Sequence, residues 1–226
     1  MTGVRKMLYL HGLGSGPESR KAQLIGEHFT TRGYEVALPS ISLPSLEELS
    51  PQAAVLFVSE KIKASLQGEF VLIGSSFGAF VANHALRLLR EEERMQVAKC
   101  VLIAPLFDPW DTLGGLLTPD RERVWREKGT FPIIDLGKGR EVPVHYRFVE
   151  ELRELSVSPI LYEVSTLIVH GAKDEVVPVS QSREFSSTRP WVRLETFEDN
   201  HQLLKDPDAL LKVLEGFILS ENRQSR

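Results

Sequence analysis

Short apolar runs rich in β-branched residues alternate along this chain with longer segments of helical period, and this alternation restricts the fold more than any other feature. Strands are expected at residues 6–10, 34–38, 70–74, 97–104, 165–170 and 192–197. Strands joined by crossover helices form a mostly parallel sheet with helices on both faces. Because 226 residues suffice for one domain with a large core, we expect a single α/β domain over residues 1–226.

The segments between these strands carry helix signals. Apolar residues recur at spacings of three and four over 19–31, and Ser50-Pro51 places a capping hydroxyl before a proline at the start of another helix. A central helix is expected over 77–90, with the charged residues 91–94 as its solvated end, and a last helix over about 207–219. These helices would cover the sheet.

The alternation breaks down over residues 105–159, which contain prolines, glycines, two tryptophans and a charged segment. We interpret this segment as a lid inserted over the carboxyl edge of the sheet. Within it, the residues after Thr118-Pro119 and the stretch His145–Leu155 are expected to form short helices.

Charge and cysteine content exclude several classes of protein. The net charge is −4 with basic and acidic residues interspersed, so no nucleic-acid partner is expected. The single cysteine, Cys100, lies in an apolar run and cannot form a disulfide within the chain. The apolar stretch Met7–Leu10 is too short for a signal peptide or a bilayer span. We expect a cytoplasmic protein without stable membrane insertion, and the oligomeric state stays open.

The strongest chemical motif follows the expected strand at 70–74. Gly74-Ser75-Ser76-Phe77-Gly78 fits Gly-x-Ser-x-Gly between a buried strand and a helix. In such a turn the glycines let strand and helix approach each other, and the serine hydroxyl is exposed. Ser76 is therefore the candidate nucleophile, and the Phe77 amide is a candidate oxyanion donor. Ser75 lacks a glycine two residues later, so we expect a structural role for it.

The first strand runs into a glycine-rich segment, His11-Gly12-Leu13-Gly14-Ser15-Gly16-Pro17. A backbone amide of this loop can supply a second oxyanion donor, and Leu13 is the candidate. The segment matches neither a P-loop nor Gly-x-Gly-x-x-Gly, so a nucleotide site is not expected. His11 is expected to brace the loop by hydrogen bonding.

Two polar loops late in the chain complete the candidate site. Asp174 follows the strand at 165–170, and His201 follows the strand at 192–197. Because the carboxyl ends of parallel strands share one edge of the sheet, both side chains can reach Ser76. Glu175 and Asp199 are weaker candidates for the carboxylate, and the other histidines are expected at the surface or in packing roles. The chain order serine, aspartate, histidine is typical of α/β-hydrolases.

His11-Gly12, Gly74-x-Ser76-x-Gly78, His170-Gly171-x-x-Asp174 and His201 together resemble the α/β-hydrolase superfamily along nearly the whole chain. Residues 9–22 and 74–78 resemble small bacterial esterases of the YqiA/YcfP type, and the longer insertion is also similar to that of mitochondrial acyl-protein thioesterases. The resemblance implies an α/β-hydrolase fold with a small lid insertion.

The expected activity is hydrolysis of a small-molecule ester or acyl thioester without metal or cofactor. His201 takes the Ser76 proton, Asp174 orients the imidazole, and the amides of Leu13 and Phe77 receive the oxyanion. A peptidase-like hydrolase and a non-catalytic binding module are the alternatives, and a cofactor-free haloperoxidase would use the same triad. The sequence has no propeller domain or peptide-specificity site, and all three triad residues are present.

Apolar residues of the insertion are candidates to line an acyl pocket, because a lid presents apolar surface inward. The alternative is a small satellite core beneath the lid. The candidates are Phe107, Trp110 and Trp125, together with Leu113, Leu116 and Leu117.

Overall fold

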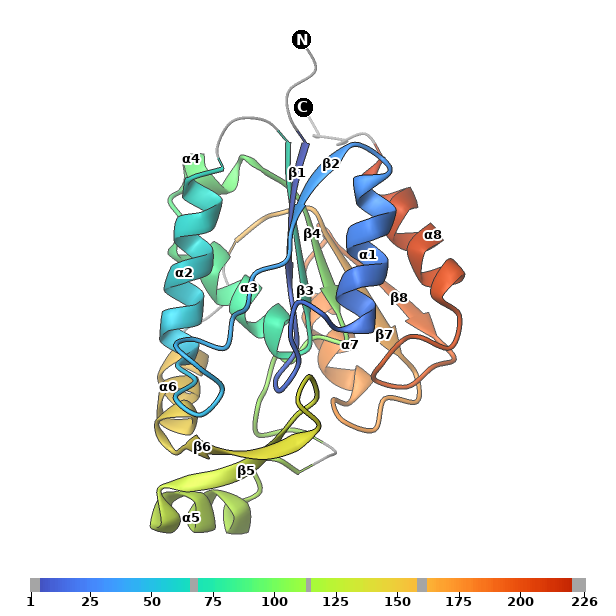
Figure 1. The fold of residues 1–226 in the computed structure, drawn as a ribbon. Helices are drawn as coiled ribbons and strands as arrows, with labels where there is room; N and C mark the ends of the chain where they lie inside the picture. Colours follow the sequence, from blue (N-terminus) through green and yellow to red (C-terminus); the bar gives the residue numbers. More distant parts are fainter. Residues whose placement is uncertain (1–4, 66–68, 113–114, 158–161, 221–226) are drawn as a thin grey trace.

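The computed structural model describes residues 5–65, 69–112, 115–157 and 162–220. Within these ranges, six parallel strands form one sheet in the order β2-β1-β3-β4-β7-β8 (Figure 1). The strands are β1 (Arg5–Leu10), β2 (Tyr34–Ala37), β3 (Glu69–Ser75), β4 (Val97–Ile103), β7 (Thr166–Gly171) and β8 (Val192–Phe197). The six expected strands and the mostly parallel sheet are confirmed.

Helices cover both faces of this sheet, as Figure 1 shows. Alternate residues of β1 separate the two cores, because Met7 and Tyr9 pack under α1 and α8 whereas Leu8 and Leu10 pack under α2 and α3. The helices are α1 (Arg20–Thr30), α2 (Pro51–Lys63), α3 (Phe77–Leu88), α4 (Glu91–Arg94), α5 (Pro119–Lys128), α6 (Arg147–Ser156), α7 (Val179–Ser187) and α8 (Pro207–Ile218).

Three of these helices begin with the same local device. The side chains of Ser50, Thr118 and Asp206 accept hydrogen bonds from backbone amides in the first turns of α2, α5 and α8, and a proline follows each of them. The capping oxygen satisfies an otherwise unpaired amide, and proline fits the first helical position because it needs no donor there. The predicted helix starts at Ser50-Pro51 and Thr118-Pro119 are confirmed.

The insertion between β4 and β7 differs from its expected secondary structure. It holds α5, the antiparallel pair β5 (Thr130–Asp135) and β6 (Arg140–His145), and α6. The helix expected at His145–Leu155 begins at Arg147 instead, because His145 ends β6. Figure 1 places the β5-β6 hairpin beyond the carboxyl ends of the sheet strands.

The charged residues after α3 do not form the solvated end of that helix, contrary to the prediction from the sequence. Helix α3 ends at Leu88, Leu89 is extended, and Glu91–Arg94 forms the separate short helix α4. Glu93 is buried and accepts hydrogen bonds from Arg90. In the part of the chain that the structure describes, no helix combines the length and the apolar character needed to cross a bilayer.

Candidate active site

Ser76 occupies a sharp turn between β3 and α3. Its φ of 54° and ψ of −116° lie where non-glycine residues are rarely found. Backbone hydrogen bonds hold the turn, since the Ser76 amide donates to the Ile103 carbonyl at 2.9 Å and the Ser76 carbonyl accepts from the Ala79 amide at 2.9 Å. The geometry is that of a nucleophile elbow.

The two glycines around Ser76 are required by close backbone contacts. A Cβ atom on Gly74 would lie 2.5 Å from the Gly78 carbonyl oxygen, and one on Gly78 would lie 2.3 Å from the Leu10 carbonyl oxygen. Any side chain at either position would push β1, β3 and α3 apart. The sequence motif therefore has a direct steric cause.

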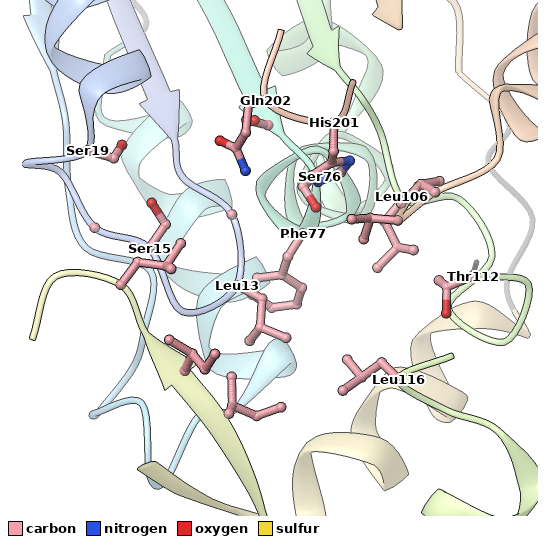
Figure 2. Close-up of a pocket in the computed structure, with 18 of the residues that line it drawn as sticks. Leu13, Ser15, Ser19, Ser76, Phe77, Leu106, Thr112, Leu116, His201 and Gln202 are labelled. Atoms are coloured by element: carbon pink, nitrogen blue, oxygen red, sulfur yellow. The ribbon is translucent and has the colours of Figure 1, made fainter. Parts of the chain in front are cut away.

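The loops after β7 and β8 bring Asp174 and His201 together. The Lys173 amide donates to the Asp199 carbonyl at 3.0 Å, which ties one loop to the other. His201 Nδ1 lies 2.7 Å from Asp174 Oδ2. Because the carboxylate is an acceptor, Nδ1 carries the proton and Nε2 keeps its lone pair. Figure 2 shows the imidazole beside Ser76, and both residues line one cavity.

The carboxylate of Asp174 is buried but well supplied with donors. Its Oδ1 accepts from the amides of Val176 at 2.8 Å and Val177 at 2.9 Å. Burial acts to raise the pKa of Asp174, but hydrogen bonds from His170, His201 and the Val177 amide hold it below its ordinary value. Asp174 is therefore a carboxylate at neutral pH, as the partner of an imidazolium must be.

His170 is a second histidine on Asp174, and its role was not predicted beyond burial. Its Nε2 lies 3.1 Å from Asp174 Oδ2 and 3.1 Å from the Val177 carbonyl oxygen, whereas Nδ1 lies 2.7 Å from Ser182 Oγ. Two acceptors at Nε2 place a proton there, and Nδ1 forms a hydrogen bond with the Ser182 hydroxyl. His170 thus fixes the orientation of the Asp174 carboxylate without itself lining the cavity. The motif His170-Gly171-x-x-Asp174 was the available signal.

The weaker carboxylate candidates lie elsewhere. Glu175 is exposed. Asp199 accepts bonds from the amides of Asn200 and Lys205 within its own loop. His11 braces the first loop as expected, because its Nε2 accepts from the Ile41 amide at 3.0 Å and its Nδ1 donates to the Gly12 carbonyl at 2.9 Å.

The two candidate oxyanion donors border the same cavity as Ser76. Phe77 is the first residue of α3, where the amide has no acceptor within the helix. Among the described residues, no acceptor is found for the amides of Phe77 and Leu13. The β5-β6 hairpin supports the Leu13 loop, because the Leu136 amide donates to the Gly14 carbonyl at 2.7 Å. A Cβ atom on Gly14 would lie 2.2 Å from the Ile134 carbonyl oxygen.

The cavity has a volume of about 910 Å³ and two chemically different halves. Leu13, Phe77, Leu106 and Leu116 lie below or to the right of Ser76 in Figure 2, with Thr112 between Leu106 and Leu116. Phe131 and Ile133 of the hairpin also line the cavity. Ser15, Ser19 and Gln202 lie on the other side. We call these the apolar half and the polar half.

The aromatic residues expected to line an acyl pocket do not border this cavity. Trp125 is fully buried, stacks between Phe131 and Phe148, and donates to the Val144 carbonyl at 2.8 Å. Phe107 stacks on Phe185. Trp110 borders a separate, shallow pocket beside Glu122.

The expected lining is corrected accordingly: Trp125 and Phe107 stack on other aromatic rings, and Trp110 lies under the Arg153 guanidinium. Leu116 and Leu117 do line the cavity. Leu113 lies outside the described residues.

A buried lysine also borders the cavity and was not predicted. Lys21 is 6% exposed, and its Nζ donates to Ser75 Oγ at 3.2 Å. The available signal was its position four residues before Ile25, on the buried face of α1.

Solved structures with this fold include several esterases and hydrolases. Alpha/beta hydrolase domain-containing protein 10 from mouse is 19% identical, with a TM-score of 0.75 over 96% of this chain and 91% of that one. Est1E from Butyrivibrio proteoclasticus, solved with ferulic acid bound, is 16% identical, with a TM-score of 0.70 over 95% and 88%. The esterase EaEST from Exiguobacterium antarcticum is 16% identical, with a TM-score of 0.65 over 97% and 94%.

These similarities confirm the α/β-hydrolase fold, with its parallel sheet and a small antiparallel hairpin insertion. A search of curated proteins finds no significant match. The model of the family described as Uncharacterised protein family (UPF0227) matches residues 6–215. The chain therefore belongs to the UPF0227 family, whose fold here is that of the α/β-hydrolases.

Proposed function

We propose that this chain is a serine hydrolase that cleaves carboxylic esters or thioesters through an acyl-enzyme on Ser76. The observation that carries the proposal is the 2.7 Å contact between His201 Nδ1 and Asp174 Oδ2 beside the strained turn of Ser76. A serine is a weak nucleophile unless a base removes its proton, and an imidazole held by a carboxylate is the common base.

In the acylation step, His201 Nε2 accepts the Ser76 proton while Ser76 Oγ attacks the carbonyl carbon. The amides of Leu13 and Phe77 donate to the oxyanion that forms, and the α3 N-terminus adds a favourable dipole. The imidazolium, stabilised by Asp174, then protonates the leaving alcohol or thiol as the carbon–oxygen or carbon–sulfur bond breaks. Water repeats the sequence in the second half-reaction, releasing the acid and restoring the Ser76 hydroxyl.

The surroundings of Ser76 favour an ester or thioester with an apolar acyl group. The apolar half of the cavity is lined mainly by leucine, isoleucine and phenylalanine side chains, which can hold an acyl chain, and Arg121 is the charged residue that borders it. The fold similarity to esterases agrees with this chemistry. We propose that the insertion 105–159, which supplies Leu116 and the hairpin wall, acts as the lid that selects the acyl group.

Labelling with a fluorophosphonate tests the nucleophile directly, because the reagent modifies only an activated serine. We expect one label, located on Ser76 by peptide mass spectrometry, and a loss of about 10⁴-fold or more in turnover of nitrophenyl esters in Ser76→Ala. The exposed Ser187→Ala is the matched control and should keep both labelling and turnover. Labelling at another residue, or near-normal turnover in Ser76→Ala, would contradict the proposal. An unlabelled folded protein would favour a binding module.

A further inference from the structure

Lys21 is a buried cation without an ionic partner at bonding distance among the residues that the structure describes. Its only hydrogen bond among the described residues is to the neutral Ser75 hydroxyl at 3.2 Å, and an ammonium has three donors. Asp174 and Asp199 act on it electrostatically, but neither forms an ion pair with it in the described part of the chain. Two donors of a buried ammonium are therefore left for another acceptor.

This position is costly for a lysine. Lys21 shares the buried face of α1 with Ala22, Ile25 and Phe29, where an apolar side chain would pack without desolvating a charge. Burial lowers the pKa of Lys21 from 10.5 to about 8, while Asp174 and Asp199 act to raise it. The side chain is thus still largely protonated at pH 7. Because this buried charge does not stabilise the fold, binding of a ligand would explain its position.

The surroundings of Lys21 form a polar subsite next to the nucleophile. Lys21 and Ser75 line the cavity, and Ser75 directly precedes Ser76. Ser15, Ser19 and Gln202 lie in the same half (Figure 2), and the Ser19 hydroxyl makes no capping bond to α1. Hydroxyl, amide and ammonium donors therefore border the cavity that contains Ser76, and the exposed side chains of Glu18 and Arg20 also line it.

We propose that Lys21 and the polar half of the cavity bind an anionic group, a carboxylate or a phosphate, on the leaving-group side of the substrate. The apolar half then receives the acyl chain. This inference rests on the proposed function and specifies its substrate class: esters or thioesters of an apolar acid with an alcohol or thiol that carries a negative charge. Lys21 acts as a binding residue that fixes which way round the substrate lies.

A matched pair of substrates tests this assignment. The anionic ester is 3-butyryloxy-4-nitrobenzoate, and the neutral one is its carboxamide; both release a coloured nitrophenolate. We expect the wild-type protein to favour the carboxylate by about tenfold to hundredfold in kcat/KM, the range supplied by one charge-assisted hydrogen bond. Lys21→Met should remove that preference, because it lowers kcat/KM for the carboxylate by a much larger factor than kcat/KM for the carboxamide.

A control variant separates the subsite from general surface charge. Lys205 is exposed and is not among the residues that line the cavity, so Lys205→Met removes the same charge from the surface and should keep most of the preference. Equal kcat/KM values for the two esters in the wild-type protein, or equal losses on both in Lys21→Met, would overturn the inference. Failure to hydrolyse either ester, together with absent fluorophosphonate labelling, would instead refute the proposed function.

The pH dependence of the preference gives a second test that needs no variant. Lys21 faces Ser75 and, through it, Tyr9; Asp174 and Asp199 act on it from the loops, and Glu18 and Arg20 flank it in sequence. Both esters are cleaved by the same catalytic groups, so the ratio of their kcat/KM values cancels any pH dependence of the shared chemistry. We expect the ratio to fall as pH rises through about 8, where Lys21 loses its proton. A ratio constant from pH 6.5 to 9.5 would contradict the role of Lys21.

Discussion

Replacing Lys21 with methionine is expected to stabilise the unliganded protein at neutral pH while removing a binding group. Methionine has a similar length and can follow the same path between α1 and Ser75 without bringing a charge into the core. A residue can lower the stability of the free protein and still be favoured if it contributes to ligand binding. Measuring the stability of Lys21→Met therefore tests, without an activity assay, whether the buried lysine destabilises the free protein.

The magnitude follows from the pKa of Lys21. A fall from 10.5 to about 8 corresponds to about 3 kcal/mol of unfavourable free energy at pH 7, because each pKa unit is worth about 1.4 kcal/mol. The variant loses the hydrogen bond to Ser75, which contributes about 1 kcal/mol. We expect Lys21→Met to be more stable than the wild-type protein by about 2 kcal/mol at pH 7.

The sign of the pH dependence is fixed by the lowered pKa. Below about pH 8 both the folded and the unfolded state carry the charge, so the burial penalty is complete; between about 8 and 10.5 only the unfolded state stays protonated, and the penalty declines. Urea unfolding followed by circular dichroism at pH 7, 8, 9 and 10 measures this difference. Comparing the two proteins at each pH cancels the titration of Tyr9 and other shared groups.

Exposed Lys205→Met is the matched control and should change the free energy of unfolding by less than about 0.5 kcal/mol. Lower stability of Lys21→Met at pH 7 would refute the reasoning, because the charge would then stabilise the fold. A stability difference that does not shrink between pH 8 and 10 would do the same.

Four further outcomes are expected. Because the pKa of Asp174 is lowered in the folded state, its ionised carboxylate stabilises the fold above about pH 4, and this stabilisation is lost as pH falls further. When pH is lowered from 6 to 2.5, the melting temperature of Asp174→Asn should therefore decrease less than that of the wild-type protein. Parallel melting-temperature curves for the two proteins would count against this. His170→Leu removes one donor to Asp174 and should lower kcat about tenfold with little change in KM, shown by steady-state kinetics on a nitrophenyl ester; an unchanged kcat would deny it a positioning role. Trp125→Phe leaves the buried Val144 carbonyl without its donor and should lower the free energy of unfolding in urea by about 1–3 kcal/mol. Leu116→Trp should shift the preferred acyl group towards shorter chains. If only Trp125→Phe changed the chain-length profile, Trp125 would have to be counted as a pocket residue.

The parallel sheet and the candidate triad were predictable because each carries a strong local signal. The central parts of β4 and β7, residues 100–103 and 167–169, are fully buried and therefore appear in the sequence as uninterrupted apolar runs. The elbow glycines are fixed by steric contacts, and the loops with Asp174 and His201 follow predicted strands directly. The Ser76 backbone strain follows from the same motif.

The hairpin and the pocket lining depend on tertiary contacts that leave weaker signals. Strands β5 and β6 are half-exposed, and Pro132 and Pro143 pair with each other in register, although proline argues against a strand interior. An aromatic side chain such as that of Trp125 can line a substrate pocket or pack in a core, and the sequence alone does not distinguish the two. In the structure Trp125 stacks on Phe131 and Phe148. Lys21 was overlooked because a single lysine on an apolar helix face is ordinarily assigned to the surface.

The hydrogen bond between Leu136 and Gly14 links two parts of the molecule that would otherwise change independently. An altered hairpin would reshape the wall facing the substrate and, through Gly14, also displace the neighbouring Leu13 amide. Engineering a new substrate range by exchanging residues 130–145 should therefore alter turnover as well as selectivity. A protein with an exchanged hairpin should keep the wild-type turnover only if residues 12–14 are exchanged together with the hairpin.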